Sequence, residues 1–151
     1  MRVSRRCEYG LRALLELAKS SNEGPVRIEE IARRQTIPKQ FLANLLVQLK
    51  RGRFVQSKKG PEGGYYLARP ARQINVGDVV RFIDGSIGPI QCVSRTLGER
   101  CEIGGRCGFF PLWRRVRDAV ADIIDHTTIA DVVEEQLREE AAGAAALMYH
   151  I

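Results

Sequence analysis

Three cysteines near the middle of the chain are the residues whose type and spacing could do chemistry. Cys92, Cys101 and Cys107 follow one another as Cys-x8-Cys-x5-Cys in a glycine-rich stretch without a helical or strand pattern. A structural zinc site needs four ligands, usually with closely spaced cysteine pairs, so neither the number nor the spacing fits zinc. A disulfide would leave one cysteine over. An iron–sulfur cluster is held mainly by thiolates and tolerates a different ligand at one corner, so the spacing favours a cluster.

Three arginines, Arg95, Arg100 and Arg106, interleave with these cysteines. Their positive charge would lower the pKa values of the thiols and offset the negative charge of a cluster. The alternative interpretation is a group of redox-sensing thiols that work through sulfenate or disulfide chemistry. The spacing leaves both interpretations open.

Composition and the absence of certain motifs argue against membrane, secreted and enzymatic functions. The chain has 151 residues, of which 44% are hydrophobic, enough for a real core. No run is apolar enough to span a membrane, and the N-terminus lacks the apolar region of a signal peptide. We therefore expect a cytoplasmic protein with no membrane partner, in which cysteines stay reduced. The two histidines, His126 and His150, have no nucleophile near them in sequence, so we expect no enzymatic activity.

The element that dominates the N-terminal half is a predicted helix-turn-helix. Pro38 suits the first turn of its second helix, whose apolar face carries Phe41, Leu42, Leu45, Leu46 and Leu49. The opposite face is small, polar and weakly basic, as a helix in a major groove requires. It carries Lys39, Gln40, Ala43, Asn44, Val47 and Lys50. A shorter helix with Ile28, Ile31 and Ala32 precedes it, and Gln35-Thr36 make the turn. Taken alone, these two helices fit an ordinary helical hairpin equally well.

A predicted β-hairpin directly after the helices distinguishes these possibilities. Phe54 to Ser57 and Tyr65 to Ala68 are strand-like, and Gly60 to Gly64 form a turn between them. Lys58 and Lys59 lie at its tip. Two helices followed by a basic hairpin predict a winged helix.

The charge distribution agrees with a DNA-binding role. Residues 1–72 contain 16 basic and 6 acidic side chains, a net charge of +10, whereas residues 73–151 carry a net charge of −4. A basic region that coincides with a winged helix is typical of proteins that bind double-stranded DNA. The predicted DNA-binding residues are Arg2, Lys39, Gln40, Ala43, Asn44, Lys50, Arg51, Lys58, Lys59 and Gly60.

Four further helices are predicted around this unit. The first spans about Ser4 to Ser20, with Cys7 on its apolar face, and Asn75 precedes a helix that Asp84-Gly85 ends. Pro111 opens another, and Thr128 with Asp131 resembles a capping box for the last. Apolar residues recur along the helix that Pro111 opens, and they predict a symmetric dimer interface or packing onto the same domain. They are Leu112, Trp113, Val116, Val120, Ile123 and Ile124.

The expected fold is mainly α with a small β-hairpin: a winged helix-turn-helix domain plus a long C-terminal dimerisation helix. Residues 1–72 form the DNA-binding domain and residues 73–110 the linker helix and cysteine loop. Residues 111–138 form the dimerisation helices, and residues 139–151 a tail that we expect to fray.

With these residues in place, the chain resembles the Rrf-two family of winged-helix repressors, of the IscR and NsrR type, over nearly its whole length. The motifs that carry the resemblance are Tyr9-Gly10-Leu11-Arg12-Ala13-Leu14, Ile37-Pro38, Phe41-Leu42, Lys59-Gly60-Pro61-Glu62-Gly63-Gly64-Tyr65, Val76-Gly77-Asp78-Val79-Val80, the three cysteines, Leu112-Trp113 and Thr128-Ile129-Ala130-Asp131.

The resemblance implies a homodimer that binds a palindromic DNA operator and whose DNA binding depends on an iron–sulfur cluster, 2Fe-2S or 4Fe-4S, in each subunit. Cys92, Cys101 and Cys107 would be its ligands. For the fourth position the resemblance offers Glu8 from the partner subunit, beside an exogenous ligand or Cys7. The alternative is a cluster-free winged-helix regulator, controlled by a protein partner or by thiol oxidation.

Three positions depart from the family pattern. Lys59 stands where the wing usually has arginine, and lysine cannot make a bidentate contact. Glu62 replaces a glycine and would repel a phosphate. Ala43 replaces an acidic or amide residue of the recognition helix, which leaves Gln40 and Asn44 as the expected base readers. The histidine that some relatives carry after the third cysteine is also missing.

Overall fold

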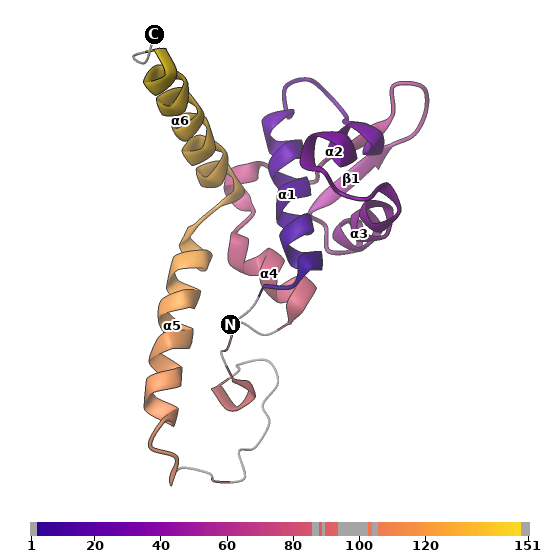
Figure 1. Cartoon of the computed structure of the whole chain (residues 1–151). Helices are drawn as coiled ribbons and strands as arrows, with labels where there is room; N and C mark the ends of the chain where they lie inside the picture. Colours follow the sequence, from indigo (N-terminus) through magenta and orange to yellow (C-terminus); the bar gives the residue numbers. More distant parts are fainter. Residues whose placement is uncertain (1–2, 86–87, 89, 94–102, 104–105, 149–151) are drawn as a thin grey trace.

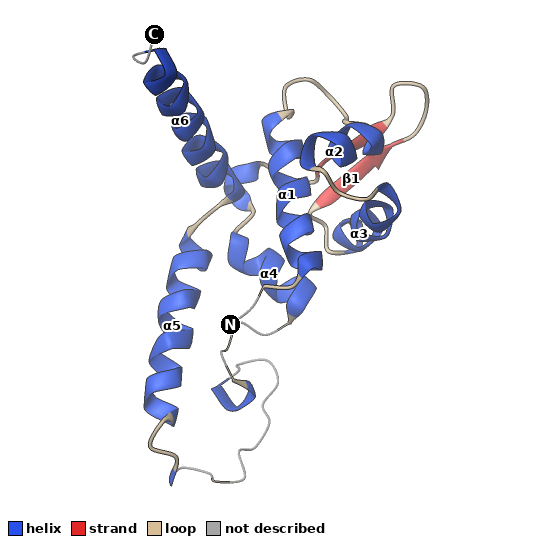
Figure 2. Cartoon of the chain, viewed as in Figure 1, coloured by secondary structure: helices blue, strands red, loops and turns tan. Residues whose placement is uncertain are grey.

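The computed structural model describes residues 3–85, 88, 90–93, 103 and 106–148 (Figure 1). Within these ranges the chain forms six α-helices and one two-stranded antiparallel sheet, so the expectation of a mainly α fold with a small hairpin is confirmed (Figure 2). The elements are α1 (Arg5–Lys19), α2 (Ile28–Gln35), α3 (Lys39–Arg51), β1 (Val55–Lys58), β2 (Gly64–Leu67), η1 (Ala71–Gln73), α4 (Val76–Asp84), η2 (Gln91–Val93), α5 (Phe110–His126) and α6 (Ile129–Met148).

Helix α1 is the central element of the DNA-binding head. Ser4 is its N-cap and accepts a hydrogen bond from the Cys7 N–H at 3.1 Å, close to the predicted start. The Ser4 N–H and hydroxyl also donate to the Asp84 carboxylate at the end of α4, which joins these two helix ends. Helix α1 contacts α2, α3 and β2 as well as α4 and α6 (Figure 1).

The hydrophobic core lies around α1. It is built from apolar side chains that are less than one-tenth exposed and that come from the helices, from β1 and from the segments that connect them. Burial of this kind is the main favourable contribution to folding. Its largest members include Leu14, Leu17, Ile31, Leu42, Leu46, Leu49, Val55, Ile74, Val79 and Ile129.

Helices α4 and α5 are joined by a two-pronged ion pair. Both terminal nitrogens of Arg81 donate to the Asp125 carboxylate, each at 2.7 Å. Gly77 lies against the same carboxylate, and a Cβ at this position would come within 1.9 Å of Asp125 Oδ1. The Val76 N–H donates to the Thr127 carbonyl at 2.9 Å. The C-terminal end of α5 is therefore fixed to the start of α4.

The apolar residues of α5 divide between two environments. Val120 and Ile124 pack against the core of the same chain, and Trp113 is half-buried. Leu112, Val116 and Ile123 are 47%, 36% and 67% exposed, at spacings that place them on one face. The helix extends away from the head (Figure 1). Packing onto the same domain therefore accounts for part of the predicted stripe and leaves an uncovered part.

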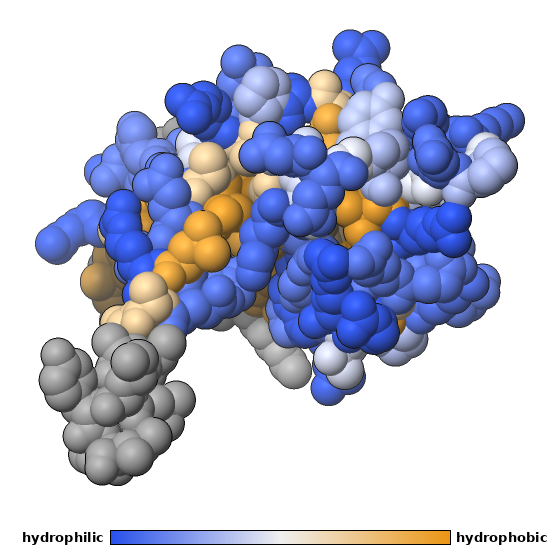
Figure 3. Space-filling model, turned by 90° about the horizontal axis from the view of Figure 1, so that it is seen from above, coloured by the Kyte–Doolittle hydropathy of each residue, from blue (hydrophilic) through white to orange (hydrophobic). Residues whose placement is uncertain are grey.

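Helix α6 begins with the predicted capping box. The Thr128 N–H and hydroxyl donate to Asp131 Oδ2, and the Asp131 N–H donates back to Thr128 Oγ1 at 3.2 Å. The helix continues to Met148, so the boundary that we placed after residue 138 lies inside it. Figure 3 shows an apolar strip along α6 on an otherwise mostly hydrophilic face. None of the described helices is both long and apolar enough to cross a membrane.

Candidate DNA-binding surface and cysteine segment

The turn between α2 and α3 has the compact geometry that the sequence predicts. Thr36 has φ 52° and ψ 46°, a left-handed conformation that ends α2. The Ile37 N–H then donates to the Ala32 carbonyl at 2.9 Å, and the Ile37 side chain is 3% exposed. Pro38 follows as the N-cap of α3. The left-handed Thr36 and the buried Ile37 therefore set the angle between α2 and α3.

A buried carboxylate fixes this turn to α1. Glu16 accepts hydrogen bonds from Arg34 Nη1 at 2.7 Å and from Gln35 Nε2 at 2.8 Å, and it is 3% exposed. Burial alone would raise the pKa of Glu16, but the hydrogen bonds and the positive charges of Arg34 and Lys19 outweigh it and lower the pKa. Arg12 donates to the Gln35 carbonyl from the same side. The last turn of α2 is therefore held in place before α3 begins.

Helix α3 has one buried and one exposed side, as predicted, except at Phe41. Leu42, Leu45, Leu46 and Leu49 are at most 2% exposed and face the core. Phe41 is 39% exposed and meets Tyr9 edge-on, with ring centroids 5.5 Å apart. We expected Phe41 on the apolar face, but it lies at the margin because its direction is well round the helix from the centre of the leucine face.

Most of the predicted DNA-binding residues on α3 are exposed. Gln40, Asn44 and Arg51 are exposed, and Ala43 is half-buried. Two lysines on the flank are held by neighbouring elements. Lys39 Nζ lies 2.6 Å from Glu29 Oε1 on α2. Lys50 Nζ donates to Ser57 Oγ on β1 at 2.7 Å, which ties the end of α3 to the wing.

The wing pairs β1 with β2 in the register that joins Val55 to Leu67 and Lys58 to Gly64. Gly60 in the connecting loop has φ +110°, a conformation that glycine adopts without strain. Lys58, Lys59 and Gly60 are all exposed. Predicted contact residue Arg2 lies outside the described residues. The described members of the predicted DNA-binding set thus lie on α3 and the wing.

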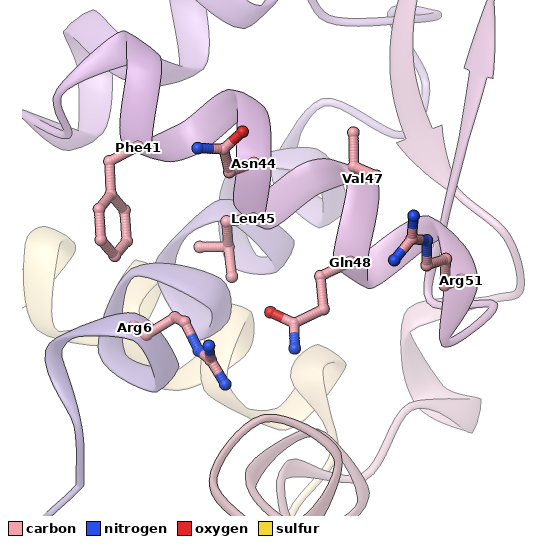
Figure 4. A pocket seen from close by; sticks show the side chains of 7 residues that line it. All are labelled: Arg6, Phe41, Asn44, Leu45, Val47, Gln48 and Arg51. Carbon is pink, nitrogen blue, oxygen red and sulfur yellow. The ribbon is translucent and has the colours of Figure 1, made fainter.

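A pocket of about 330 Å³ flanks α3 on the side of α1 (Figure 4). Sequence reasoning did not assign Arg6, Val47 or Gln48 to the DNA-binding set, although all three line this pocket together with Asn44 and Arg51. Arg6 also donates to the Ile83 carbonyl at 2.9 Å. Val47 and Gln48 follow Asn44 at i+3 and i+4, so the helical period could have placed them beside it. The position of Arg6 next to α3 depends on how α1 packs and could not be predicted in this way.

Two of the three predicted cluster ligands lie in described parts of the cysteine segment. Cys92 is half-buried on η2, and the neighbouring Val93 is 1% exposed. Arg117 Nη1 on α5 donates to the Val93 carbonyl at 2.7 Å. Cys107 is half-buried, and its carbonyl accepts the Phe110 N–H at 3.1 Å. The segment is therefore attached to α5 at both described ends.

The third cysteine, Cys101, and two of the interleaved arginines, Arg95 and Arg100, lie outside the described residues. In the part of the chain that the structure does describe, no three histidine, cysteine or acidic side chains gather in a way that could hold a metal ion. The described residues therefore place Cys92 and Cys107 but do not bring a full ligand set together.

The two candidates for a fourth ligand have opposite surroundings. Cys7 is fully buried, and burial, followed by the Asp84 carboxylate, raises its pKa to about 11, although Arg6 acts in the other direction. Its complete burial places Cys7 within the hydrophobic core of the head. The Glu8 side chain is 55% exposed on the first turns of α1, and its carboxylate lies 3.4 Å from Arg12.

Comparison with known proteins identifies relatives over most of the chain. The HTH-type transcriptional regulator Rv1287 of Mycobacterium tuberculosis is 37% identical over 145 residues, which cover 96% of this chain and 89% of that protein. The HTH-type transcriptional regulator IscR of Pectobacterium carotovorum is 35% identical over 136 residues, 90% of this chain and 81% of the relative. These names describe a non-enzymatic role.

Solved structures give the same fold. The structure of CymR (YrzC), the global cysteine regulator of B. subtilis, has a TM-score of 0.77 and 32% sequence identity. The match covers 89% of this chain and 98% of that one. The family model described as Rrf2, iron-dependent transcriptional regulator, matches residues 3–135. The chain therefore belongs to the Rrf2 family of winged-helix, DNA-binding transcriptional regulators.

Proposed function

We propose that this protein is a homodimeric transcriptional repressor whose binding to palindromic double-stranded DNA is controlled by an iron–sulfur cluster. Cys92, Cys101 and Cys107 would hold the cluster, and its loss or change would carry the signal. The observation that carries this proposal is the attachment of the cysteine segment to α5. Cys92 lies next to the buried Val93, whose carbonyl is bound by Arg117 of that helix.

The donor set fits an iron–sulfur cluster. Thiolates are soft ligands that suit iron and sulfide, and the described Cys92 and Cys107 are both half-buried, so they are neither sealed in the core nor fully in water. Arg106 adjoins Cys107 and brings positive charge to the segment. The similarity to IscR of Pectobacterium carotovorum supports the same assignment.

A continuous series of contacts connects this segment to the DNA-binding head. Arg117 joins η2 to α5, and the Arg81–Asp125 pair joins α5 to α4. Asp84 at the end of α4 then binds Ser4 at the start of α1. A change in the cysteine segment that moves α5 can therefore act on the helix around which the head is packed.

The uncovered apolar face of α5 supports the dimer. Leu112, Val116 and Ile123 form an exposed stripe, and a two-fold axis would bring the stripe of one protomer against that of its partner. A two-fold dimer would also present two copies of α3 to a palindromic operator. The half-buried Trp113, next to Leu112, would complete the contact between the two α5 helices.

For the fourth ligand we retain Glu8 of the partner subunit and an exogenous small molecule as equal candidates. The Glu8 carboxylate is exposed enough to reach another chain, and within this chain it pairs with Arg12. An oxygen ligand binds weakly to a soft site and would exchange readily, which suits a sensor.

A thiol switch is the second candidate function, because CymR, a global cysteine regulator, has a similar fold at 32% identity. In that case Cys92 and Cys107 would be oxidised directly, without a cluster. The two functions differ in whether the active protein carries iron and sulfide.

The test is to purify the full chain without oxygen and to record its visible spectrum, iron and sulfide content, and DNA affinity. We expect brown protein whose colour is lost in Cys92→Ala, Cys101→Ala or Cys107→Ala and is kept in the control Cys7→Ala. Protein that stays colourless after reconstitution with iron and sulfide would overturn the cluster. If peroxide then changes its DNA affinity through Cys92 or Cys107, the thiol switch takes its place.

A further inference from the structure

An apolar side chain stands in the middle of the polar, DNA-facing side of α3. Val47 is 50% exposed, and on a helix it is flanked by Asn44 at i−3 and Arg51 at i+4. Figure 4 shows its side chain projecting from the opposite side of α3 to Leu45. A lone exposed valine is common on protein surfaces, so its surroundings decide its meaning.

The surroundings of Val47 form a narrow apolar strip inside a positive rim. Ala43 lies one turn before it on the same face and is half-buried, so its methyl group extends the strip without blocking access. Lys39 and Lys50 border the strip on one side, and their ammonium groups are held by Glu29 and Ser57. Gln40, Asn44 and Arg51 border it on the other.

This combination fits one occupant, the major groove of DNA. The rim belongs to the half of the chain with a net charge of +10, which attracts a polyanion and disfavours a basic or apolar protein partner. The phosphates of a duplex would meet the lysines and arginine, and base edges would meet the centre of the strip. In the major groove, the apolar group that base pairs present is the C5-methyl group of thymine.

We propose that Val47, supported by Ala43, reads the C5-methyl group of a thymine in each half of the operator, and that it is a specificity-determining residue of this protein. The inference rests on the proposed DNA-binding face of α3 and not on the cluster. Val47 sits about two turns beyond Gln40, roughly 10 Å along the helix axis. The thymine should therefore lie some three base pairs from the base read by Gln40, at 3.4 Å per pair.

The contact predicts a definite loss of affinity when one methyl group is removed from the DNA. Removing a buried group of this size corresponds to about a four-fold change in affinity. A symmetric dimer would make the contact twice, so removal from both half-sites should cost about sixteen-fold. Exchange of thymine for deoxyuridine makes this change and leaves the base pair, its hydrogen bonds and the phosphates intact.

The experiment begins with selection of the preferred operator from randomised duplexes, using the wild-type full chain. Each thymine is then replaced by deoxyuridine, symmetrically and one position at a time, and affinities are compared with those of Val47→Ala. We expect the wild type to lose affinity at one position and Val47→Ala to bind the thymine and deoxyuridine duplexes equally. Val47→Thr keeps one methyl group and should retain most of the discrimination.

Leu137→Ala is the matched control, because Leu137 is also 50% exposed but lies on α6. It should discriminate as the wild type does, and the salt dependence of Val47→Ala should be unchanged because no phosphate contact is lost. Discrimination that persists in Val47→Ala, or a wild type that tolerates deoxyuridine at every position, overturns the proposal. The affinities for the thymine and deoxyuridine duplexes are measured with the same protein preparation, so their ratio does not depend on the cluster. Absence of a cluster would be detected separately, in the visible spectrum.

Discussion

Replacing Glu16 by glutamine should weaken the attachment of α2 to α1 and thereby destabilise the head. The carboxylate is 3% exposed and receives two side-chain hydrogen bonds, from Arg34 and Gln35. Glutamine keeps the shape but removes the charge, so Arg34 loses its buried partner and retains Glu30. Glu16, Arg34 and Gln35 together hold the end of α2 directly before α3. Because α3 is the proposed DNA-reading helix, we expect DNA affinity to fall together with stability.

The size of the effect follows from burial. Removing one partner of a buried ion pair costs about 3–5 kcal/mol, but Arg34 is about a third exposed and can turn toward water. We therefore expect a loss of roughly 2–3 kcal/mol at pH 7, at or below the lower end of that range. For a chain of this length that lowers Tm by roughly 4–12 °C.

The effect of Glu16→Gln on stability should depend on pH, and the pKa of Glu16 fixes the direction. The pKa of Glu16 is lower in the folded protein than in the unfolded chain, where it is near 4.5. Its contribution to stability is therefore complete above about pH 4.5 and is lost as pH falls through the folded pKa. The wild type and Glu16→Gln should consequently differ most near neutrality and converge in acid.

The assay is urea unfolding followed by circular dichroism between pH 3 and pH 7. Glu30→Gln is the matched control, since Glu30 pairs with the same arginine but is 39% exposed, and such a pair contributes only about 0.5 kcal/mol. Equal losses in the two variants, or a difference that is the same at every pH, would refute the reasoning from burial.

Three further predictions concern the wing, the dimer and α6. Lys59→Ala, at the exposed wing tip, should weaken DNA binding about equally for all sequences and reduce the salt slope by about one; an unchanged slope would remove the wing from the interface. Ile123 is 67% exposed in the single chain, so Ile123→Glu should leave the fold intact. In the proposed dimer the new charge would be buried without a partner, so we expect a folded monomer in sedimentation. An unchanged dimer would move the interface elsewhere. Asp131→Asn should destabilise α6 at neutral pH, because the Thr128 N–H and hydroxyl bind the carboxylate and lower its pKa. That difference should vanish as pH falls below the folded pKa of Asp131, and a melting curve that is unaltered at pH 7 would contradict it.

Local signals in the sequence determined the elements. The N-cap serine at position 4, the capping box of Thr128 and Asp131, and the turn at Gln35-Thr36 each act within a few residues, so they are readable without the fold. The same holds for the wing, where the glycine-rich turn and its φ-positive Gly60 fix the hairpin. The spacing of the cysteines suggested their chemistry in the same local way.

Only the tertiary structure decided which polar and apolar side chains are covered. Glu16 reads as a surface residue of an amphipathic helix, yet Arg34 and Gln35 from α2 close over it. Phe41 fits the apolar period of α3 but remains 39% exposed. The period of a helix tells which residues share a face, whereas burial depends on the width of the neighbour that packs there, and that neighbour comes from distant sequence.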